Sequence, residues 1–219
     1  MNPKHEYSSI SDSQTVTTFK ALVEAIVPSS PAYAIYGEAY AAGAVDLCIH
    51  EYMIWELDHN LSLFLGYYLE DIPMAAPTAM LLNDGAAQYI ASGKALDPQF
   101  YAVWGGGPFA SLSPRDRIRV LAMLEQLDID LGTLPPPYKD DGGLITFIVD
   151  YLNRGTMFGF YSEWSAYGST RLKTPEERRL EYFPISWKQV GYPGVSKGYR
   201  ALRGFMLTIE RNGTKEEIR

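Results

Sequence analysis

The stretch LSPRDRIRVLAMLEQL, Leu112–Leu127, decides the fold class of this chain. Ser113 can cap a helix, Pro114 suits the first helical position, and Asp116 favours the first turn, where the helix dipole attracts negative charge. Apolar residues then recur at helical spacing, at Ile118, Leu121, Leu124 and Leu127. Start signals and periodicity agree, so the stretch predicts an amphipathic α-helix.

Similar patterns occur along most of the chain. They predict helices over 16–27, over 38–70 with Asn60 as a candidate break, over 76–92, and from 143 into an aromatic loop. The stretch TPEERRLEYF, 174–183, repeats the capping logic with Thr174, Pro175 and Glu177. Alternating strand pairs with hairpin turns are not apparent. We therefore expect a mostly α fold with few strands.

A single domain is expected, because 219 residues suit one core and no linker-like stretch interrupts the chain. The predicted boundaries are a flexible N-terminus over 1–13, one helical domain over 14–209, and a charged, frayed tail over 210–219. Long loops rich in Gly, Pro and aromatic residues occupy the C-terminal third of the domain. Ordered loops of that length usually have a function.

Charge and cysteine content exclude several classes of protein. The net charge is −7, and the best basic cluster, Arg115, Arg117 and Arg119 around Asp116, is typical of a solvated helix face. We therefore expect no nucleic-acid partner. The single cysteine, Cys48, cannot form an intrachain disulfide or a cysteine-rich metal centre, and its apolar surroundings predict a buried, inert thiol.

Targeting and membrane signals are also missing from the sequence. The most apolar stretch, IPMAAPTAMLL, has 11 residues and two prolines, whereas a membrane span needs about 20 residues. The N-terminal stretch has neither an apolar signal region nor a twin arginine. We expect a cytoplasmic protein without a membrane span, with export to the periplasm together with a partner as the alternative.

Only one stretch could supply a metal or acid–base site. HEYMIWELDH contains His50, Glu56 and His59, and Asp46 lies one turn before His50. The zinc-protease motif is absent because position 54 is Ile54. Glu56 and His59 form an E-x-x-H pair, but no second pair exists to complete a di-iron site. A lone metal site using Asp46, His50, Glu56 and His59 remains an alternative to surface ion pairs.

Other catalytic and cofactor motifs are missing. No G-x-S-x-G elbow, dinucleotide fingerprint or P-loop occurs, so we predict no catalytic residues and no cofactor in this chain. The glycine-rich stretch SWKQVGYPGVSKGYR, 186–200, is interrupted by Pro193, which removes a backbone donor that a phosphate cradle requires. Tyr192, Pro193 and Gly194 instead predict a rigid turn that packs Trp187 and Tyr192.

Aromatic residues are the unusual part of the composition: 16 Tyr, 9 Phe and 4 Trp. Such rings can form the core, or they can serve as interface anchors because they bury a large area and keep a polar tip. The C-terminal loops concentrate them. The predicted partner-interface residues are Phe160, Tyr161, Trp164, Trp187, Tyr192, Pro193 and Gly194.

The succession of several short motifs resembles a known family. LVEAIVP, AGAVDLCIHEYM, LSPRDRIRVLAML, GFYSEWSAYG and SWKQVGYPG follow one another over roughly 16–198. This order is similar to that in the small subunit, subunit 3 or gamma, of membrane-type gluconate 2-dehydrogenase. Each motif is short and has no catalytic meaning by itself, so the resemblance rests on their order and spacing.

The resemblance implies a small, helical, cofactor-free subunit. Its partner would be a large FAD-containing oxidoreductase of the glucose–methanol–choline type, acting on a sugar, a sugar acid or a glycoside. The small subunit would bind and stabilise that partner, and some complexes add a cytochrome c subunit. Family members often carry a twin-arginine signal, which this chain lacks. Two alternatives stay open: a free-standing metal-dependent enzyme, and a stand-alone binder of small molecules.

Overall fold

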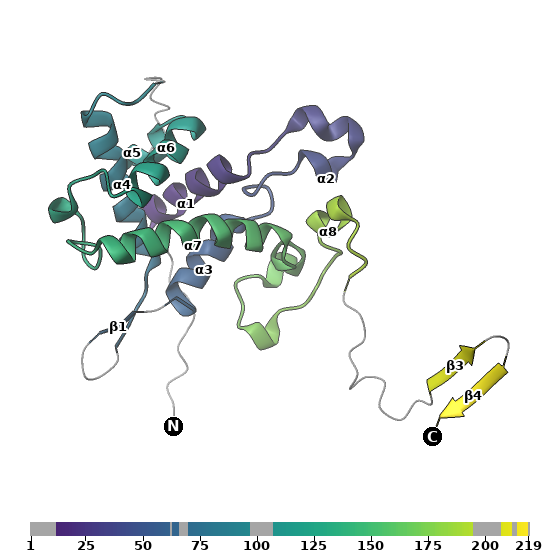
Figure 1. The fold of residues 1–219 in the computed structure, drawn as a ribbon. Coiled ribbons are helices and arrows are strands. Elements are labelled where there is room, and N and C mark those ends of the chain that lie inside the picture. The colour runs from purple at the N-terminus through teal and green to yellow at the C-terminus, as the bar shows by residue number, and fades with distance from the viewer. Residues whose placement is uncertain are drawn as a thin grey trace.

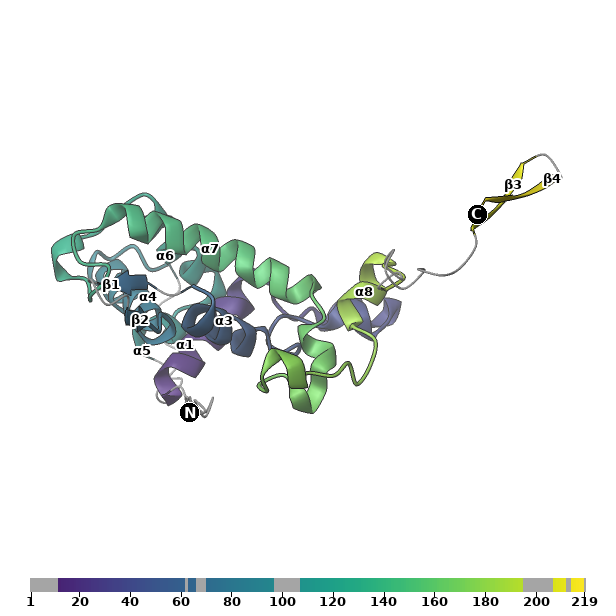
Figure 2. The ribbon, with the colours of Figure 1, turned by 90° about the horizontal axis from the view of Figure 1, so that it is seen from below.

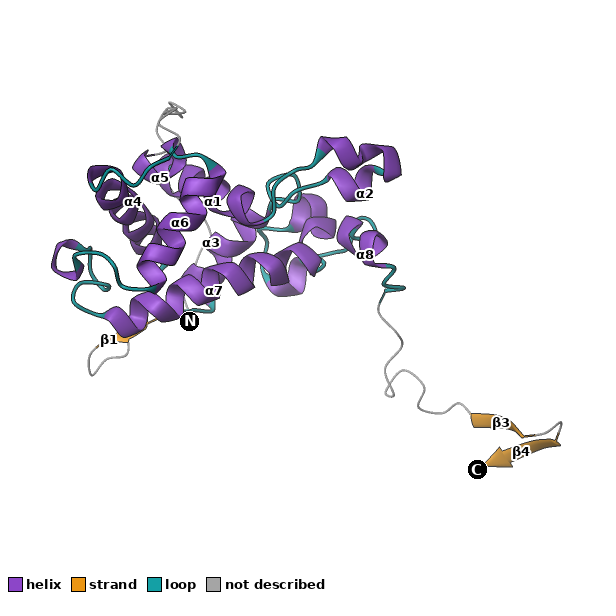
Figure 3. Cartoon of the chain, turned by 45° about the horizontal axis from the view of Figure 1, so that its top comes forward, coloured by secondary structure: helices purple, strands orange, loops and turns teal. Residues whose placement is uncertain are grey.

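The computed structural model describes residues 12–61, 63–65, 70–96, 107–194, 207–211 and 214–218. It is a mostly helical single domain, as predicted (Figures 1 and 3). Strands in these residues are confined to two short antiparallel hairpins. Leu63–Leu65 (β1) pairs with Glu70–Ile72 (β2), and Leu207–Arg211 (β3) pairs with Thr214–Ile218 (β4).

Five helices build the core around one buried apolar cluster. They are α1 (Ser13–Ile26), α3 (Ile49–His59), α4 (Ala75–Ala91), α6 (Pro114–Glu125) and α7 (Gly142–Tyr161), with the short α5 (Gly107–Ser111) against α1 and α4. Their fully buried side chains include Phe19, Leu22, Ile49, Met53, Leu57, Leu81, Leu82 and Leu124. The long helix α7 extends from this core toward the C-terminal segments, where it positions the candidate site (Figure 1).

The capping predictions for the fold-deciding stretch are confirmed. Ser113 Oγ accepts a hydrogen bond from the Asp116 amide at 3.3 Å, and Pro114 opens α6. The predicted solvated face is wrong at two positions, because Asp116 is fully buried and Arg117 is only 4% exposed. Arg117 has three acceptors. Its guanidinium donates to Glu24 at 2.6 Å and to the Ala21 and Ala110 carbonyl oxygens. Paired charge and carbonyl acceptors allow this arginine to be buried.

The predicted helix over 38–70 is divided in the structure. A four-residue helix, α2 (Glu38–Ala41), and α3 are separated by a turn in which Cys48 adopts a left-handed conformation, φ 56°. Gly43, between the two helices, lies against the backbone of Pro28 and Ser29, where an added Cβ would not fit. The expected break at Asn60 is confirmed, since α3 ends at His59.

Cys48 is half-buried and free, and burial raises the pKa of its thiol. A raised pKa disfavours the reactive thiolate, which agrees with the expectation of an inert cysteine.

Two predictions about the C-terminal part need correction. The stretch 174–183 forms only a 3₁₀ turn, η4 (Pro175–Glu177), and the Thr174 hydroxyl donates to the Glu177 carboxylate and does not accept from a backbone amide as a helix cap would. The predicted frayed tail over 210–219 differs from the structure, in which β3 and β4 pair as a hairpin there. Most of the predicted flexible N-terminus, residues 1–11, lies outside the described residues. Among the helices described, none is long and apolar enough to cross a membrane.

Candidate functional site

A short helical arm projects its apolar side chains into solvent. It consists of η1 (Pro31–Tyr36) and α2, and neither element contains a buried residue. The exposed fractions are 56% for Tyr33, 82% for Ile35, 68% for Tyr36 and 45% for Tyr40. We call residues 31–41 the arm. Its large apolar side chains contribute little to the core of this chain.

The base of the arm is tightly closed. Ser30 N donates to Ala41 O, and Ala44 N donates to Val27 O, both at 2.9 Å. Asp46 Oδ2 accepts from Ser29 Oγ at 2.6 Å and from Gly43 N at 2.8 Å. These bonds join the two ends of the arm, so its exposed side chains are held on an ordered support.

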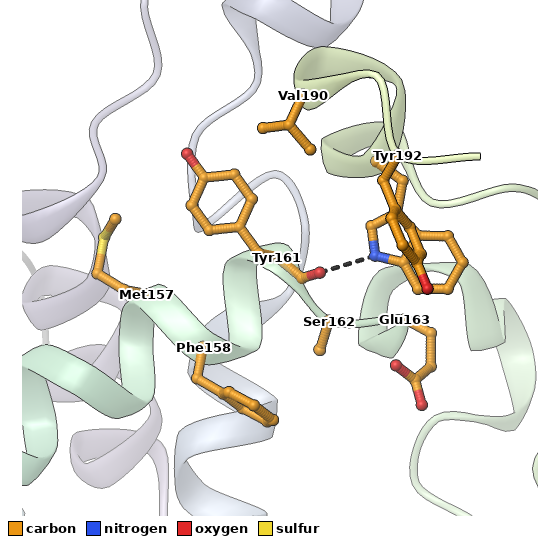
Figure 4. Close-up of a pocket in the computed structure, with 8 residues that line it drawn as sticks. Met157, Phe158, Tyr161, Ser162, Glu163, Val190 and Tyr192 are labelled. Atoms are coloured by element: carbon orange, nitrogen blue, oxygen red, sulfur yellow. Dashed lines mark hydrogen bonds between the residues drawn. The ribbon is translucent and has the colours of Figure 1, made fainter. Parts of the chain in front are cut away.

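An open groove lies between the end of α7 and the short helix α8 (Ile185–Val190) (Figure 4). Its volume is about 740 Å³. The residues that line it are Met157, Phe158, Tyr161, Ser162, Glu163, Trp187, Val190 and Tyr192. Phe158, 69% exposed, and Val190, 58% exposed, present the most apolar surface. We call this hollow the aromatic groove.

Trp187 forms the floor of the groove and fixes α8 on α7. It is 8% exposed, and its indole Nε1 donates to the Tyr161 carbonyl oxygen at 2.7 Å (Figure 4). Phe183 and Tyr192 meet its ring edge to face, with centroids 5.6 and 4.8 Å away. The prediction of a turn that packs Trp187 and Tyr192 is therefore confirmed.

Gly191 allows the chain to reverse after α8. It adopts a left-handed conformation, φ 70° and ψ 23°, which only glycine adopts without a steric cost. The Tyr192 amide then donates back to the Trp187 carbonyl at 2.9 Å. Gly194 also has a positive φ, 99°. The third glycine of the stretch, Gly198, lies outside the described residues.

The arm and the groove belong to one surface. A second hollow, of about 360 Å³, lies between them and is lined by Tyr33, Tyr40, Tyr161 and Gln189 among others. Tyr161 lines both hollows, and α2 contacts α8, which lies beside it in Figure 2. We call the arm together with the two hollows the aromatic face.

The seven predicted interface residues divide between surface and interior. Tyr161 (41% exposed), Tyr192 (45%) and Pro193 are exposed, and Gly194 is half-buried. For the other three the expectation is wrong, because the chain itself buries them: Phe160, Trp164 and Trp187. Trp164, for example, donates its indole N–H to the Cys48 carbonyl at 3.1 Å. These rings support the surface but do not present themselves to a partner.

Sequence reasoning missed the arm, which it treated as a short loop followed by a helix. A signal was present, because residues 31–43 contain three tyrosines and an isoleucine but only one charged residue, Glu38. A loop with that composition needs something to cover it. Phe158 belongs to the aromatic stretch that predicted an interface, but it is not one of the seven predicted residues, because the apolar pattern of α7 does not show which residues pass beyond the core.

The predicted metal ligands do not converge. Asp46 closes the base of the arm, Glu56 accepts from the Tyr151 hydroxyl at 3.2 Å, and His59 Nδ1 bonds to the Trp55 carbonyl oxygen at 2.8 Å. His50 is buried. Over the described part of the chain, no three His, Cys, Asp or Glu side chains are grouped as a metal site. The described residues therefore give no support to a metal site at Asp46, His50, Glu56 and His59.

His50 gives the chain a testable response to pH. Burial lowers its pKa to about 4, opposed by the nearby Glu51 carboxylate and reinforced by Lys20 and Arg171. In the unfolded chain an ordinary histidine takes up a proton near pH 6.5. Between about pH 6.5 and 4 only the unfolded state binds this proton, so stability falls as the pH falls through this window.

We expect wild-type protein to lose about 2 kcal/mol more free energy of unfolding than His50→Gln when the pH falls from about 7 to about 4.5. Urea unfolding of both proteins at the two pH values measures the difference. His59→Gln removes an exposed imidazole and is the matched control. An equal loss in wild type and His50→Gln would contradict the assignment.

Comparison of the chain with protein-family models, curated proteins and solved structures gave no match.

Proposed function

We propose that this chain is a non-catalytic small subunit that docks on a larger protein through its aromatic face. The partner would be a large FAD-dependent oxidoreductase of the glucose–methanol–choline type that oxidises a sugar, a sugar acid or a glycoside. The observation that carries the docking role is the arm, an ordered element that buries none of its own residues while exposing three tyrosines and an isoleucine.

The exposed apolar side chains of the arm favour a role in binding a partner protein. Soluble monomers rarely expose large contiguous apolar patches, and larger ones usually mark interaction sites. Tyrosine and other aromatic residues are enriched where proteins associate. The arm is also closed at its base by four hydrogen bonds of 2.6–2.9 Å. A surface ordered in advance loses little conformational entropy when a partner covers it.

The class of the partner comes from the sequence resemblance alone. That resemblance places FAD and the redox chemistry in the large subunit, with a cytochrome c subunit as a further candidate component. This chain would contribute stability and shape to the complex.

Co-expression with the flavoprotein gene nearest to this one, followed by affinity capture of this chain, tests the proposal. We expect a stoichiometric large chain with a flavin absorption spectrum. The partner assignment fails if the captured complex contains a large chain without flavin. The docking role itself fails if the chain is captured alone and stays monomeric at high concentration.

A single substitution tests where the partner docks. Tyr192→Asp puts a charge on an exposed ring of the groove, and we expect it to weaken partner association by about 2 kcal/mol or more, as hot-spot substitutions do. Titration of the labelled variant against the partner gives the affinity.

The matched control is Met80→Asp, an exposed apolar residue on α4 outside the aromatic face. It should bind like wild type. Equal affinities of Tyr192→Asp and wild type would place the interface elsewhere.

The aromatic groove also supports a second candidate, a stand-alone binder of small molecules. Its volume of about 740 Å³ lies within the range of ligand sites. This candidate predicts a stable monomer whose unfolding temperature rises with an aromatic or apolar ligand. A screen by thermal shift, repeated with Tyr192→Asp, separates it from the docking role.

A further inference from the structure

An aromatic cage encloses the side chain of Arg178. The guanidinium carbon lies 4.2 Å from the ring centre of Trp55, 4.9 Å from that of Trp164 and 6.0 Å from that of Tyr167. Trp55 comes from α3, and the other two rings come from the 3₁₀ segment η3 (Trp164–Thr170). We call these three rings the cage. A cation within about 6 Å of an aromatic face is attracted by the negative face of the ring.

The cage is fixed independently of the arginine. Trp55 stacks on His59 with centroids 4.9 Å apart, and the Trp164 indole N–H donates to the Cys48 carbonyl. The Tyr167 hydroxyl donates to the Glu163 carboxylate at 3.0 Å. Each ring therefore has its own support, so the cage should persist if the arginine leaves.

Arg178 itself fits the cage incompletely. Its Nε donates to the Lys173 carbonyl at 3.2 Å, but its Nη2 is buried and has no hydrogen-bond partner. Burial lowers the pKa of this guanidinium, while the negative charge of Glu56 and the Tyr167 hydroxyl oppose that shift. The cage thus offers aromatic faces and negative potential to a cation. It does not offer an acceptor to each N–H group of the guanidinium, and a buried donor without an acceptor is costly.

A cation without N–H groups would match these surroundings better. A quaternary ammonium group has the same charge, presents only methyl and methylene groups to the rings, and leaves no donor unsatisfied. Arg178 is half-buried, so its side chain has a route to solvent. The backbone need not move, because the amide and the carbonyl of Arg179 both bond to the Thr170 hydroxyl.

We propose that the cage of Trp55, Trp164 and Tyr167 is a binding site for the quaternary ammonium group of a small organic cation, and that Arg178 is an internal plug which this cation displaces. The site is separate from the docking role of the aromatic face and does not depend on it. Removal of the plug should therefore increase the affinity of the chain for such cations.

Titration with tetramethylammonium, followed by tryptophan fluorescence at constant ionic strength, tests the site. Arg178→Ala should bind at least about tenfold more tightly than wild type, because the ligand no longer competes with a tethered cation. Arg179→Ala is the matched control: it removes a neighbouring exposed arginine that bonds only to backbone carbonyls. It should bind like wild type.

Two further measurements identify the cage as the site. Trp55→Leu in the Arg178→Ala background should abolish binding, and 3,3-dimethyl-1-butanol, whose tert-butyl group is similar in shape to tetramethylammonium but uncharged, should not compete. Arg178→Gln provides a second unplugged protein if the alanine variant does not fold. Wild-type protein titrated to about 0.5 M should also saturate, which needs no variant.

The proposal is overturned if folded Arg178→Ala shows no saturable binding up to about 50 mM tetramethylammonium. Equal affinities of Arg178→Ala and wild type overturn it too, as does binding that survives Trp55→Leu. If neither Arg178→Ala nor Arg178→Gln folds, a wild-type titration that does not saturate overturns the proposal.

Discussion

Replacement of Trp187 by alanine is expected to lower the free energy of unfolding by about 3 kcal/mol, the range for deletion of a buried aromatic side chain. Trp187 is 8% exposed, donates its indole N–H to the Tyr161 carbonyl, and is flanked edge to face by Phe183 and Tyr192. Loss of the indole removes all of these contacts together. We expect α8 to detach from α7 and the aromatic groove to lose its floor.

Chemical unfolding gives the stability, and hydrogen exchange shows whether α8 opens before the core. Trp187→Phe keeps most of the ring and loses the N–H donor, so it should cost less, about 1–2 kcal/mol. Val190→Ala changes a residue of the same helix that is 58% exposed, and it is the control. A stability of Trp187→Ala close to that of Val190→Ala would show that the indole does not hold α8.

This prediction also shows what sequence patterns can and cannot decide. The glycine- and aromatic-rich stretch indicated that Trp187 has a structural or docking role, and the turn that packs it is confirmed. The pattern did not show which way the indole of Trp187 points. Whether an indole faces a partner or its own chain depends on the Tyr161 carbonyl, which lies 26 residues away in sequence.

Local features were the best predicted. The caps of α6 and the break at Asn60 depend on residues within one helical turn, and the structure confirms both. Arg117 shows the limit of such reasoning. Two of its three acceptors, Ala21 and Glu24, are more than 90 residues away, so its position in an Arg-rich helix start predicted a solvated face.

The candidate site was predicted only in part, again because contacts between residues distant in sequence decide it. Asp46 and His50 lie one helical turn apart in sequence, which would align them only on a continuous helix. The turn before α3 removes that alignment, and Asp46 instead bonds to Ser29 and Gly43. Asp46, a candidate metal ligand in the sequence, is therefore a structural residue that bonds to the backbone at Gly43.

Gly43 is therefore the position where a single methyl group should have the second large effect. A Cβ there would overlap the Ser29 amide nitrogen and lie 2.7 Å from the Pro28 carbonyl carbon. Neither is a flexible side chain, so the backbone must move. We expect Gly43→Ala to lower the free energy of unfolding by about 3 kcal/mol, the upper part of the range for overpacking.

The effect should reach the proposed docking surface. Displacement of Gly43 breaks its bond to Asp46 and strains the Ser30–Ala41 and Ala44–Val27 backbone bonds that close the arm. Chemical unfolding should show the loss of stability, and hydrogen exchange should show faster exchange over residues 29–44. If the arm docks on a partner, Gly43→Ala should also weaken association by more than Tyr192→Asp does, because the whole arm loses its order.

The matched control is Gly143→Ala, in the first turn of α7, where an added Cβ meets only the Asp141 carboxylate at 3.5 Å. That is ordinary contact, and alanine favours a helix over glycine by about 1 kcal/mol, so this variant should be as stable as wild type or slightly more stable. If Gly43→Ala matched it, the close approach at Ser29 would not hold the arm, and its order would have to come from the contact of α2 with α8.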